Sequence, residues 1–233
     1  MSKVHPLLGK RILAIFAHPD DEAYLVSGTA NSNQKAGGKT SIICATLGEK
    51  GSSHLQKKIS PAKLKALRKM ELLAATKHAN ATKLYILNFP DGQVHQYQKK
   101  FMVQCDQVLK KELSEVIISF GPDGYTGHRD HIACWKVASA LAKKYRMPLY
   151  IATVPPKLIN HMHKWLMPKR VNPHYDDICD YCRPTVKIPT SPGFKRRVLS
   201  HYPSQVDLKN PYGDAPASAV KELFAAEYFA RIV

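Results

Sequence analysis

Two short polar clusters contain the residues of this sequence that are best suited to chemistry. The first is the hexapeptide AHPDDE at residues 17–22, which directly follows an apolar run at 12–16. Charged side chains are seldom buried without partners, so a histidine beside three carboxylates needs an explanation at this place. One explanation is metal coordination by His18 and Asp21, with Asp20 left free for proton transfer. The alternative is a polar turn in which Asp20 or Asp21 caps the next helix.

The second cluster is GHRDH at residues 127–131, which also follows an expected strand and opens an expected helix. His128 and His131 are three residues apart and can therefore face the same side of a helical turn. Taken alone, this spacing is equally well explained by a capped helix start with solvent-facing histidines. The metal-binding interpretation of the pair is favoured by the position that the expected fold gives it, as the strand order shows.

The rest of the chain alternates expected strands with expected helices. Strands are predicted at 12–16, 40–47, 84–87, 115–120 and 149–154, with helices at 23–34, 61–78, 99–113 and from about residue 130. This alternation predicts a Rossmann-like three-layer α/β sandwich with a mostly parallel sheet in the order 3-2-1-4-5. The first and fourth strands are then neighbours at the switch point, so the two polar clusters face each other. One metal shared between them, with a position left for water, is typical of a catalytic zinc site.

The C-terminal part gives a weaker pattern. Recurrent prolines over 155–217 predict an irregular cap, with a strand at 183–188, a short helix at 193–201 and a closing amphipathic helix at 220–231. We therefore expect a single domain over 1–233, in which residues 1–154 form the core and 155–233 the cap and closing helix. The first strand is not followed by a G-x-G-x-x-G motif, which disfavours dinucleotide binding.

Bulk properties set further bounds. The 233 residues carry a net charge of +17, but the lysines are spread along the chain and no nucleic-acid module is recognisable, which favours a solvated surface with weak support for an acidic ligand. No membrane span or secretory leader is visible, so a cytoplasmic location is expected. Five cysteines, three of them in apolar runs, argue against a disulfide framework. Cys179 and Cys182 form a lone CxxC, for which ordinary thiols are a better explanation than a second metal site.

The motifs AHPDDE (17–22) and GPDGYTGHRDH (121–131) together resemble the LmbE-like (PIG-L) family of zinc-dependent N-deacetylases. The similarity extends to LGEKGS (47–52), LRKME (67–71), FPDG (89–92) and KRRVLSHYPSQ (195–205), in the order of the family. The resemblance implies a hydrolase that removes the N-acetyl group from an N-acetylglucosamine-type amino sugar or glycoconjugate and releases acetate and a free amine.

The resemblance also implies a role for each matching residue. The metal ligands would be His18, Asp21 and His131, holding Zn²⁺, although Fe²⁺ can occupy such a site. Asp20 would be the general base, His128 in protonated form would stabilise the oxyanion, and Asp130 would orient His128. Substrate binding would involve Arg68, Asp91 and His201. The sequence departs from the family at Tyr24 and Leu25, where many relatives carry a glycine pair, and at Arg129, where proline is common.

The expected partner is a small N-acetylated sugar, for which the net charge and Arg68 favour an anionic substituent. Whether the chain forms a homo-oligomer is left open by the sequence. The alternative function is a basic binding module for nucleic acid or anionic lipid with a non-catalytic metal site. A binding module has no need of a free carboxylate at Asp20 beside the metal ligands, which favours the hydrolase.

Overall fold

The computed structural model describes residues 5–55, 59–154, 158, 183–213 and 215–233. Within them, seven strands form one sheet in the order β3-β2-β1-β4-β5-β7-β6. Strands β1 to β5 run parallel to one another, whereas β7 is antiparallel to both β5 and β6. The α/β class and the predicted order of the first five strands are therefore confirmed.

The strands of the sheet are β1 (Arg11–Phe16), β2 (Lys39–Thr46), β3 (Lys83–Phe89), β4 (Val116–Ser119), β5 (Leu149–Thr153), β6 (Val186–Pro189) and β7 (Ala226–Arg231). The longer helices are α2 (Ser27–Lys35), α3 (Pro61–His78), α4 (Gln98–Lys111), α6 (Arg129–Tyr145), α8 (Pro192–Leu199) and α9 (Ala217–Ala225). Three short helices complete the described elements: α1 (Asp21–Leu25), η1 (Val94–Tyr97) and α5 (Gly124–Gly127).

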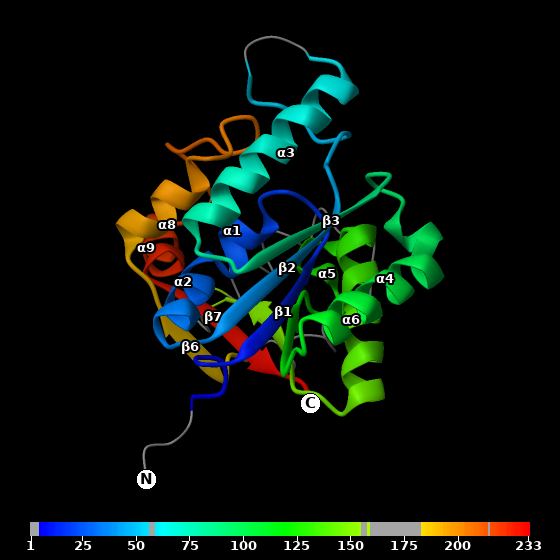
Figure 1. Cartoon of the computed structure of the whole chain (residues 1–233). Helices are drawn as coiled ribbons and strands as arrows, with labels where there is room; N and C mark the ends of the chain where they lie inside the picture. Colours follow the sequence, from blue (N-terminus) through cyan, green and yellow to red (C-terminus); the bar gives the residue numbers. More distant parts are fainter. Residues whose placement is uncertain (1–4, 56–58, 155–157, 159–182, 214) are drawn as a thin grey trace.

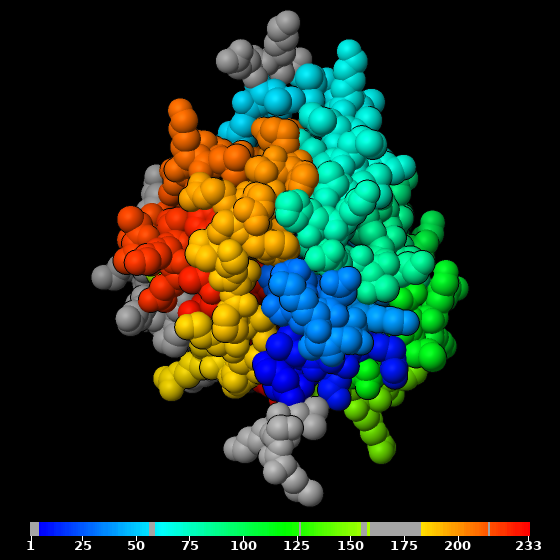
Figure 2. All heavy atoms as spheres, turned by 60° about the vertical axis from the view of Figure 1, so that its left-hand side comes forward, coloured from blue at the N-terminus to red at the C-terminus, as the bar shows by residue number. Residues whose placement is uncertain are grey.

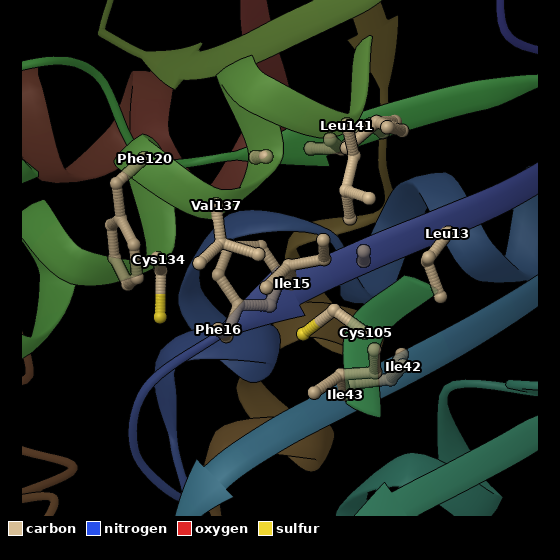
Figure 3. Packing of buried hydrophobic residues seen from close by; sticks show 14 of the residues in the cluster. Leu13, Ile15, Phe16, Ile42, Ile43, Cys105, Phe120, Cys134, Val137 and Leu141 are labelled. Atoms are coloured by element: carbon tan, nitrogen blue, oxygen red, sulfur yellow. The ribbon is translucent and has the colours of Figure 1, made fainter. Parts of the chain in front are cut away.

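Helices cover both faces of the sheet, with α4 and α6 on one face and α1, α2, α3, α8 and α9 on the other (Figure 1). Strand β1 is central and is buried from its second residue to its last, which explains its unbroken apolar sequence. In Figure 3, Cys134, Val137 and Leu141 of α6 lie over β1, and Cys105 of α4 lies nearby. Burial on both faces holds the carboxyl end of β1, and the motif that follows it, in a fixed place.

Helix α3 begins where the sequence predicts. The Ser60 side chain accepts a hydrogen bond from the backbone N–H of Lys63 at 3.4 Å, and Pro61 occupies the first turn. Figure 2 shows α8 and the residues that follow it, coloured gold to orange, lying against α3 and α2. This contact joins the C-terminal part of the chain to the helices beside the AHPDDE motif.

The predicted closing helix at 220–231 is wrong in its second half. Helix α9 ends at Ala225, and Ala226–Arg231 forms β7 between β5 and β6. The first five residues of β7 are all buried, so its sequence AEYFAR lacks the alternation of a half-exposed strand, and so short a segment cannot be distinguished from helix by periodicity. Pairing with two strands from elsewhere in the chain decides the conformation.

A buried ion pair connects β7 to the helices beneath the site. Glu227 accepts hydrogen bonds from the backbone N–H groups of Gly28 (2.9 Å) and Thr29 (2.7 Å), and from the Thr29 hydroxyl at 2.7 Å. Lys195 of α8 places its ammonium 3.0 Å from Glu227 Oε1, and both side chains are at most 2 % exposed. The carboxylate thus binds the first turn of α2 and the lysine of α8 at once.

No helix in the described ranges combines the length and the apolar character needed to cross a bilayer. The CxxC formed by Cys179 and Cys182 lies outside the described residues, as do residues 155–157, 159–182 and 214 of the predicted irregular cap. The three cysteines that the structure describes as free and buried are Cys44, Cys105 and Cys134.

Candidate metal centre and active site

The loop after β1 fixes the carboxylate of Asp21 beside His18. Asp21 is the first residue of α1, and its Oδ2 accepts hydrogen bonds from the backbone N–H groups of Ala17 (3.2 Å) and His18 (2.7 Å). The His18 ring lies next to it, with Nδ1 at 3.7 Å from the same oxygen. The three-residue spacing in AHPDDE therefore brings an imidazole and a carboxylate to one point at the carboxyl end of β1.

Asp20 adopts a backbone conformation that few non-glycine residues take. Its φ is 100° and its ψ −30°, and such conformations cost about 1–3 kcal/mol and persist only where surrounding contacts enforce them. The Asp20 N–H donates to Glu22 Oε2 at 3.2 Å, and Asp20 Oδ2 lies 3.2 Å from Arg68 Nη2. Glu22 is in turn bound by the hydroxyl of Tyr202. These contacts aim the Asp20 carboxylate toward the cavity described below.

The second cluster lies where α5 meets α6. His128 is the N-cap of α6, and its Nδ1 accepts a hydrogen bond from the backbone N–H of Asp130 at 3.2 Å. His131 lies one turn later, stacked on Phe120 with ring centroids 4.0 Å apart, and its Nδ1 is 2.8 Å from the carbonyl oxygen of Gly124. A carbonyl can only accept, so Nδ1 carries the proton and Nε2 presents a lone pair, which is the usual arrangement of a metal-binding histidine.

The two clusters meet, as the predicted topology requires. His131 Nε2 lies 3.1 Å from His18 Nδ1 and 3.5 Å from Asp21 Oδ1. Ligand atoms around a tetrahedral Zn²⁺ with bonds of about 2.0–2.1 Å are about 3.3 Å apart, so these separations suit one ion. Two imidazole nitrogens and a carboxylate oxygen are also the donor types that zinc prefers. The residues present therefore fit a metal ion.

Further carboxylates surround the other nitrogen of His18. Its buried Nε2 lies 3.1 Å from Asp91 Oδ1 and 3.5 Å from Asp130 Oδ2, and it makes no hydrogen bond of good geometry. Burial lowers the pKa of His18, but Asp130, Asp91 and Asp21 together outweigh this effect and raise it to about 10. A cluster with this surplus of negative charge favours a bound cation. In the described part of the chain, the ligand-type side chains form two overlapping groups, His18 with His128 and His131, and His18 with Asp91 and Asp130. Neither group contains Asp21, which approaches His131 through Oδ1 and His18 through Oδ2.

Asp130 is buried, and its carboxylate does not contact the His128 ring that it was expected to orient. It accepts hydrogen bonds from the backbone N–H groups of Gly92 (2.7 Å) and Val94 (3.0 Å) and faces His18. The contact between Asp130 and His128 is made by the Asp130 backbone N–H instead. Partial burial, followed by the positive charge of His18, lowers the pKa of His128.

A cavity of about 370 Å³ opens onto these groups. The described residues that line it are His18, Asp20, Asp21, Lys50, Gly51, Arg68, Asp91, Gly92, His128 and His131. Arg68 and Asp91 thus line the cavity, and their roles in substrate binding stay predictions. His201 is not among these lining residues, and its Nε2 lies 2.9 Å from Nδ1 of His78 at the end of α3. A role of His201 in substrate binding stays a prediction.

Sequence reasoning singled out no residue of the LGEKGS stretch, yet this loop after β2 contributes two lining residues, Lys50 and Gly51. The sequence also did not reveal that Tyr202, in the HYPSQ stretch, binds Glu22 of the AHPDDE motif. Both stretches resemble the corresponding motifs of the family, so the sequence pointed to the stretches although not to particular residues in them. The particular side chains could not be chosen because their partners are far away in the sequence.

Comparison with known proteins agrees with this arrangement. The family model described as "PIG-L: GlcNAc-PI de-N-acetylase" matches residues 13–142. A probable N-acetyl-α-D-glucosaminyl L-malate deacetylase of Bacillus subtilis is 31 % identical over 138 residues, which cover 58 % of this chain and 62 % of the relative. A 1D-myo-inositol 2-acetamido-2-deoxy-α-D-glucopyranoside deacetylase of Corynebacterium urealyticum is 26 % identical over 162 residues, covering 58 % of this chain and 48 % of the relative. The chain thus spans about half to just under two thirds of these relatives.

Solved structures share the fold at low sequence identity. A deacetylase in complex with teicoplanin has a TM-score of 0.66 at 13 % identity and covers 96 % of this chain and 98 % of its own. A 4-carboxy-2-hydroxymuconate hydratase from Pseudomonas putida has a TM-score of 0.64 at 17 % identity, with 96 % of both chains covered. The fold therefore accommodates more than one reaction. Because the family model matches more than half of the residues and both of its polar clusters, the chain belongs to the PIG-L (LmbE-like) family.

Proposed function

We propose that the protein is a zinc-dependent N-deacetylase acting on an N-acetylglucosamine-type sugar or glycoconjugate. The observation that carries the proposal is the meeting of His18, Asp21 and His131 at metal-binding distances with the Asp20 carboxylate lining the same cavity. The relatives named as acetamido-sugar deacetylases support the substrate class. The Zn²⁺ held by the two histidines and Asp21 would supply a Lewis acid that polarises the acetamide carbonyl and makes water more acidic.

Asp20 is suited to be the general base. Burial raises its pKa to about 7, although the positive charge of Arg68 opposes the shift. A base with a pKa near the working pH can take a proton from water and later return it. In this scheme Asp20 accepts the water proton as the oxygen attacks the acetamide carbon. It then gives that proton to the nitrogen as the C–N bond breaks, so the products are acetate and the amine.

His128 is suited to stabilise the oxyanion as a neutral donor. Its Nδ1 accepts a hydrogen bond from the Asp130 N–H, so the proton of the neutral ring lies on Nε2. The His128 side chain lines the cavity, where Nε2–H can donate to the carbonyl oxygen as negative charge develops. One such donor is typically worth about 10²–10³ in rate. This role does not require the protonated ring that the family resemblance implies.

The test combines amine release with metal analysis. Zinc-loaded protein is incubated with N-acetylglucosaminyl malate, N-acetylglucosaminyl inositol and diacetylchitobiose, and freed amine and acetate are quantified. We expect one-to-one release from at least one substrate, and a loss of roughly 10²–10⁴ in Asp20→Asn with unchanged zinc content. Asp207→Asn, on an exposed loop, is the matched control and should keep full activity.

Two outcomes would overturn the proposal. One is zinc-loaded protein that releases no amine from any of the three substrates. The other is Asp20→Asn retaining the activity of the parent protein. Salt-sensitive retention of DNA or anionic vesicles without amine release would instead support the basic binding module.

A further inference from the structure

Besides its histidines, the cavity is lined by one arginine and one lysine, and the arginine is engaged through both of its terminal nitrogens. Arg68 is 4 % exposed, and its guanidinium donates to the carbonyl oxygens of Gly48 (2.9 Å) and Pro19 (2.5 Å) besides its contact with Asp20. A ligand could accept hydrogen bonds from these two nitrogens only if Arg68 lost its contacts with Asp20 and with the two backbone carbonyl groups. Arg68 therefore supports the base through Nη2, while its buried Nε has no hydrogen-bond partner among the described residues.

Lys50 is the other cation. Its backbone N–H donates to Asp91 Oδ2 at 2.9 Å, which fixes the lysine at the wall of the cavity. The side chain runs over Gly92, with Nζ 3.8 Å from the position that a Cβ on that glycine would occupy. The absence of a side chain at residue 92 leaves the ammonium room beside the metal cluster.

The ammonium of Lys50 has no hydrogen bond or ion pair with any described residue. The neighbouring carboxylates each have another partner through at least one oxygen. Asp91 faces His18, Asp21 accepts two backbone N–H groups, and Glu49 Oε1 accepts the N–H of Asp91, whereas the buried Glu49 Oε2 has no hydrogen-bond partner in the described chain. A positive charge at a cavity wall without a partner is a ready contact for an anion.

We propose that Lys50 binds an anionic group, a carboxylate or a phosphate, on the substituent joined to the acetamido sugar, so that the enzyme selects anionic glycoconjugates over neutral ones. This inference rests on the proposed function for the position of the sugar, because the acetamide must lie at Asp20 and the metal cluster. The substituent then extends along the wall formed by Lys50, Gly51 and Gly92. Lys50 would thus set specificity without taking part in the chemistry.

The experiment compares three glycosides that share the acetamido sugar: N-acetylglucosaminyl malate with two carboxylates, N-acetylglucosamine 1-phosphate, and neutral N-acetylglucosaminyl inositol. The variants are Lys50→Met, which keeps most of the stem, Lys50→Arg, which keeps the charge, and Lys77→Met, an exposed lysine of α3, as the matched control. For each, kcat and KM are measured at low and high salt. Binding of the glycosides is measured by calorimetry, which needs no turnover.

We expect Lys50→Met to lower kcat/KM for the preferred anionic glycoside about 10- to 100-fold through KM, the range for a hydrogen bond to a charged group. The neutral glycoside should be unaffected, Lys50→Arg should largely restore the preference, and high salt should reduce it. Whether malate or phosphate is preferred identifies the anion.

Equal use of anionic and neutral glycosides by the parent protein, or an unchanged ratio in Lys50→Met, would refute the role of Lys50 while leaving deacetylation intact. If no glycoside is turned over, calorimetry still decides: weaker binding of the anionic glycosides to Lys50→Met supports the anion site although the deacetylase proposal has failed. Equal binding to both proteins refutes it.

Discussion

Replacing Lys195 by methionine tests how the C-terminal strand is held against the helices that carry the site. The substitution keeps most of the stem but removes the charge that lies 3.0 Å from Glu227 Oε1, and Lys195 is only 1 % exposed. Glu227 would keep its hydrogen bonds from Gly28 and Thr29. The variant therefore isolates the effect of leaving a buried carboxylate without its counter-charge.

Removing one partner of a buried ion pair costs about 3–5 kcal/mol, because the remaining charge stays desolvated. The hydrogen bonds that Glu227 retains place Lys195→Met near the lower end, at about 3 kcal/mol. For a chain of this size each kcal/mol lowers the melting temperature by about 2–4 °C, so we expect a decrease of roughly 6–12 °C. The double variant Lys195→Met/Glu227→Gln should be less destabilised than the sum of the two single variants.

The assay is urea unfolding followed by circular dichroism, with calorimetric melting temperatures on the same samples. The matched control is Lys144→Met, which removes an exposed ion pair of similar length: Lys144 Nζ lies 2.9 Å from Asp106 Oδ1 with 55 % of the lysine side chain exposed. Exposed pairs contribute little to stability, because water and salt screen their charges. If Lys195→Met were no more destabilising than Lys144→Met, the account of the buried pair would be refuted.

Three further predictions concern other parts of the chain. Gly48 has a φ of +64° and a Cβ there would lie 2.0 Å from Arg68 Nη1, so Gly48→Ala should displace Arg68 and reduce amine release at least about tenfold, the effect of misplacing a supporting group. Gly37→Ala, with a φ of +79° and nothing within 4 Å, should show only backbone strain and keep the activity. Burial, together with the neighbouring charges of His201 and Arg197, lowers the pKa of His78, so the unfolded chain binds a proton more readily and the folded state loses stability as the pH falls through about 6.5. His78→Gln should lose less stability between pH 7.5 and 5.5 in urea titrations, and an equal loss would contradict this. Burial raises the pKa of the three described free thiols, which belong to Cys44, Cys105 and Cys134. Their alkylation, mapped by mass spectrometry, should therefore be slow in the native state and fast in urea. Rapid labelling of any of the three in the native state would count against their burial.

The sequence was most informative where local pattern and final environment agree. The apolar run of β1 is buried on both faces, and the parallel order of five strands follows from the alternation of strands and helices. The meeting of His18 with His131 follows from that order and from the placement of polar residues at carboxyl ends of strands. Family membership, which those two motifs indicated, is confirmed by the family model.

Features that depend on distant partners were not predictable. Ala226–Arg231 has the composition of a helix but becomes a strand because β5 and β6 offer it two rows of hydrogen bonds. Spacing could not show that Asp130 would turn to the backbone of Gly92 and Val94, since those groups reach it from the loop after β3. The engagement of Arg68 by Asp20 and two carbonyl groups was likewise invisible in its position within LRKME.

The position of β7 has a consequence for how the molecule matures during synthesis. Strand β6 is synthesised before β7, but within the described chain its sheet partner is β7. Strand β6 therefore stays unpaired while residues 190–225 are synthesised. The first turn of α2 and the ammonium of Lys195 also have no contact with Glu227 until β7 has been synthesised. A nascent chain arrested before residue 226 would therefore expose a sheet edge beside β5 to chaperones or to other chains, although the motif that follows β1 was translated some two hundred residues earlier.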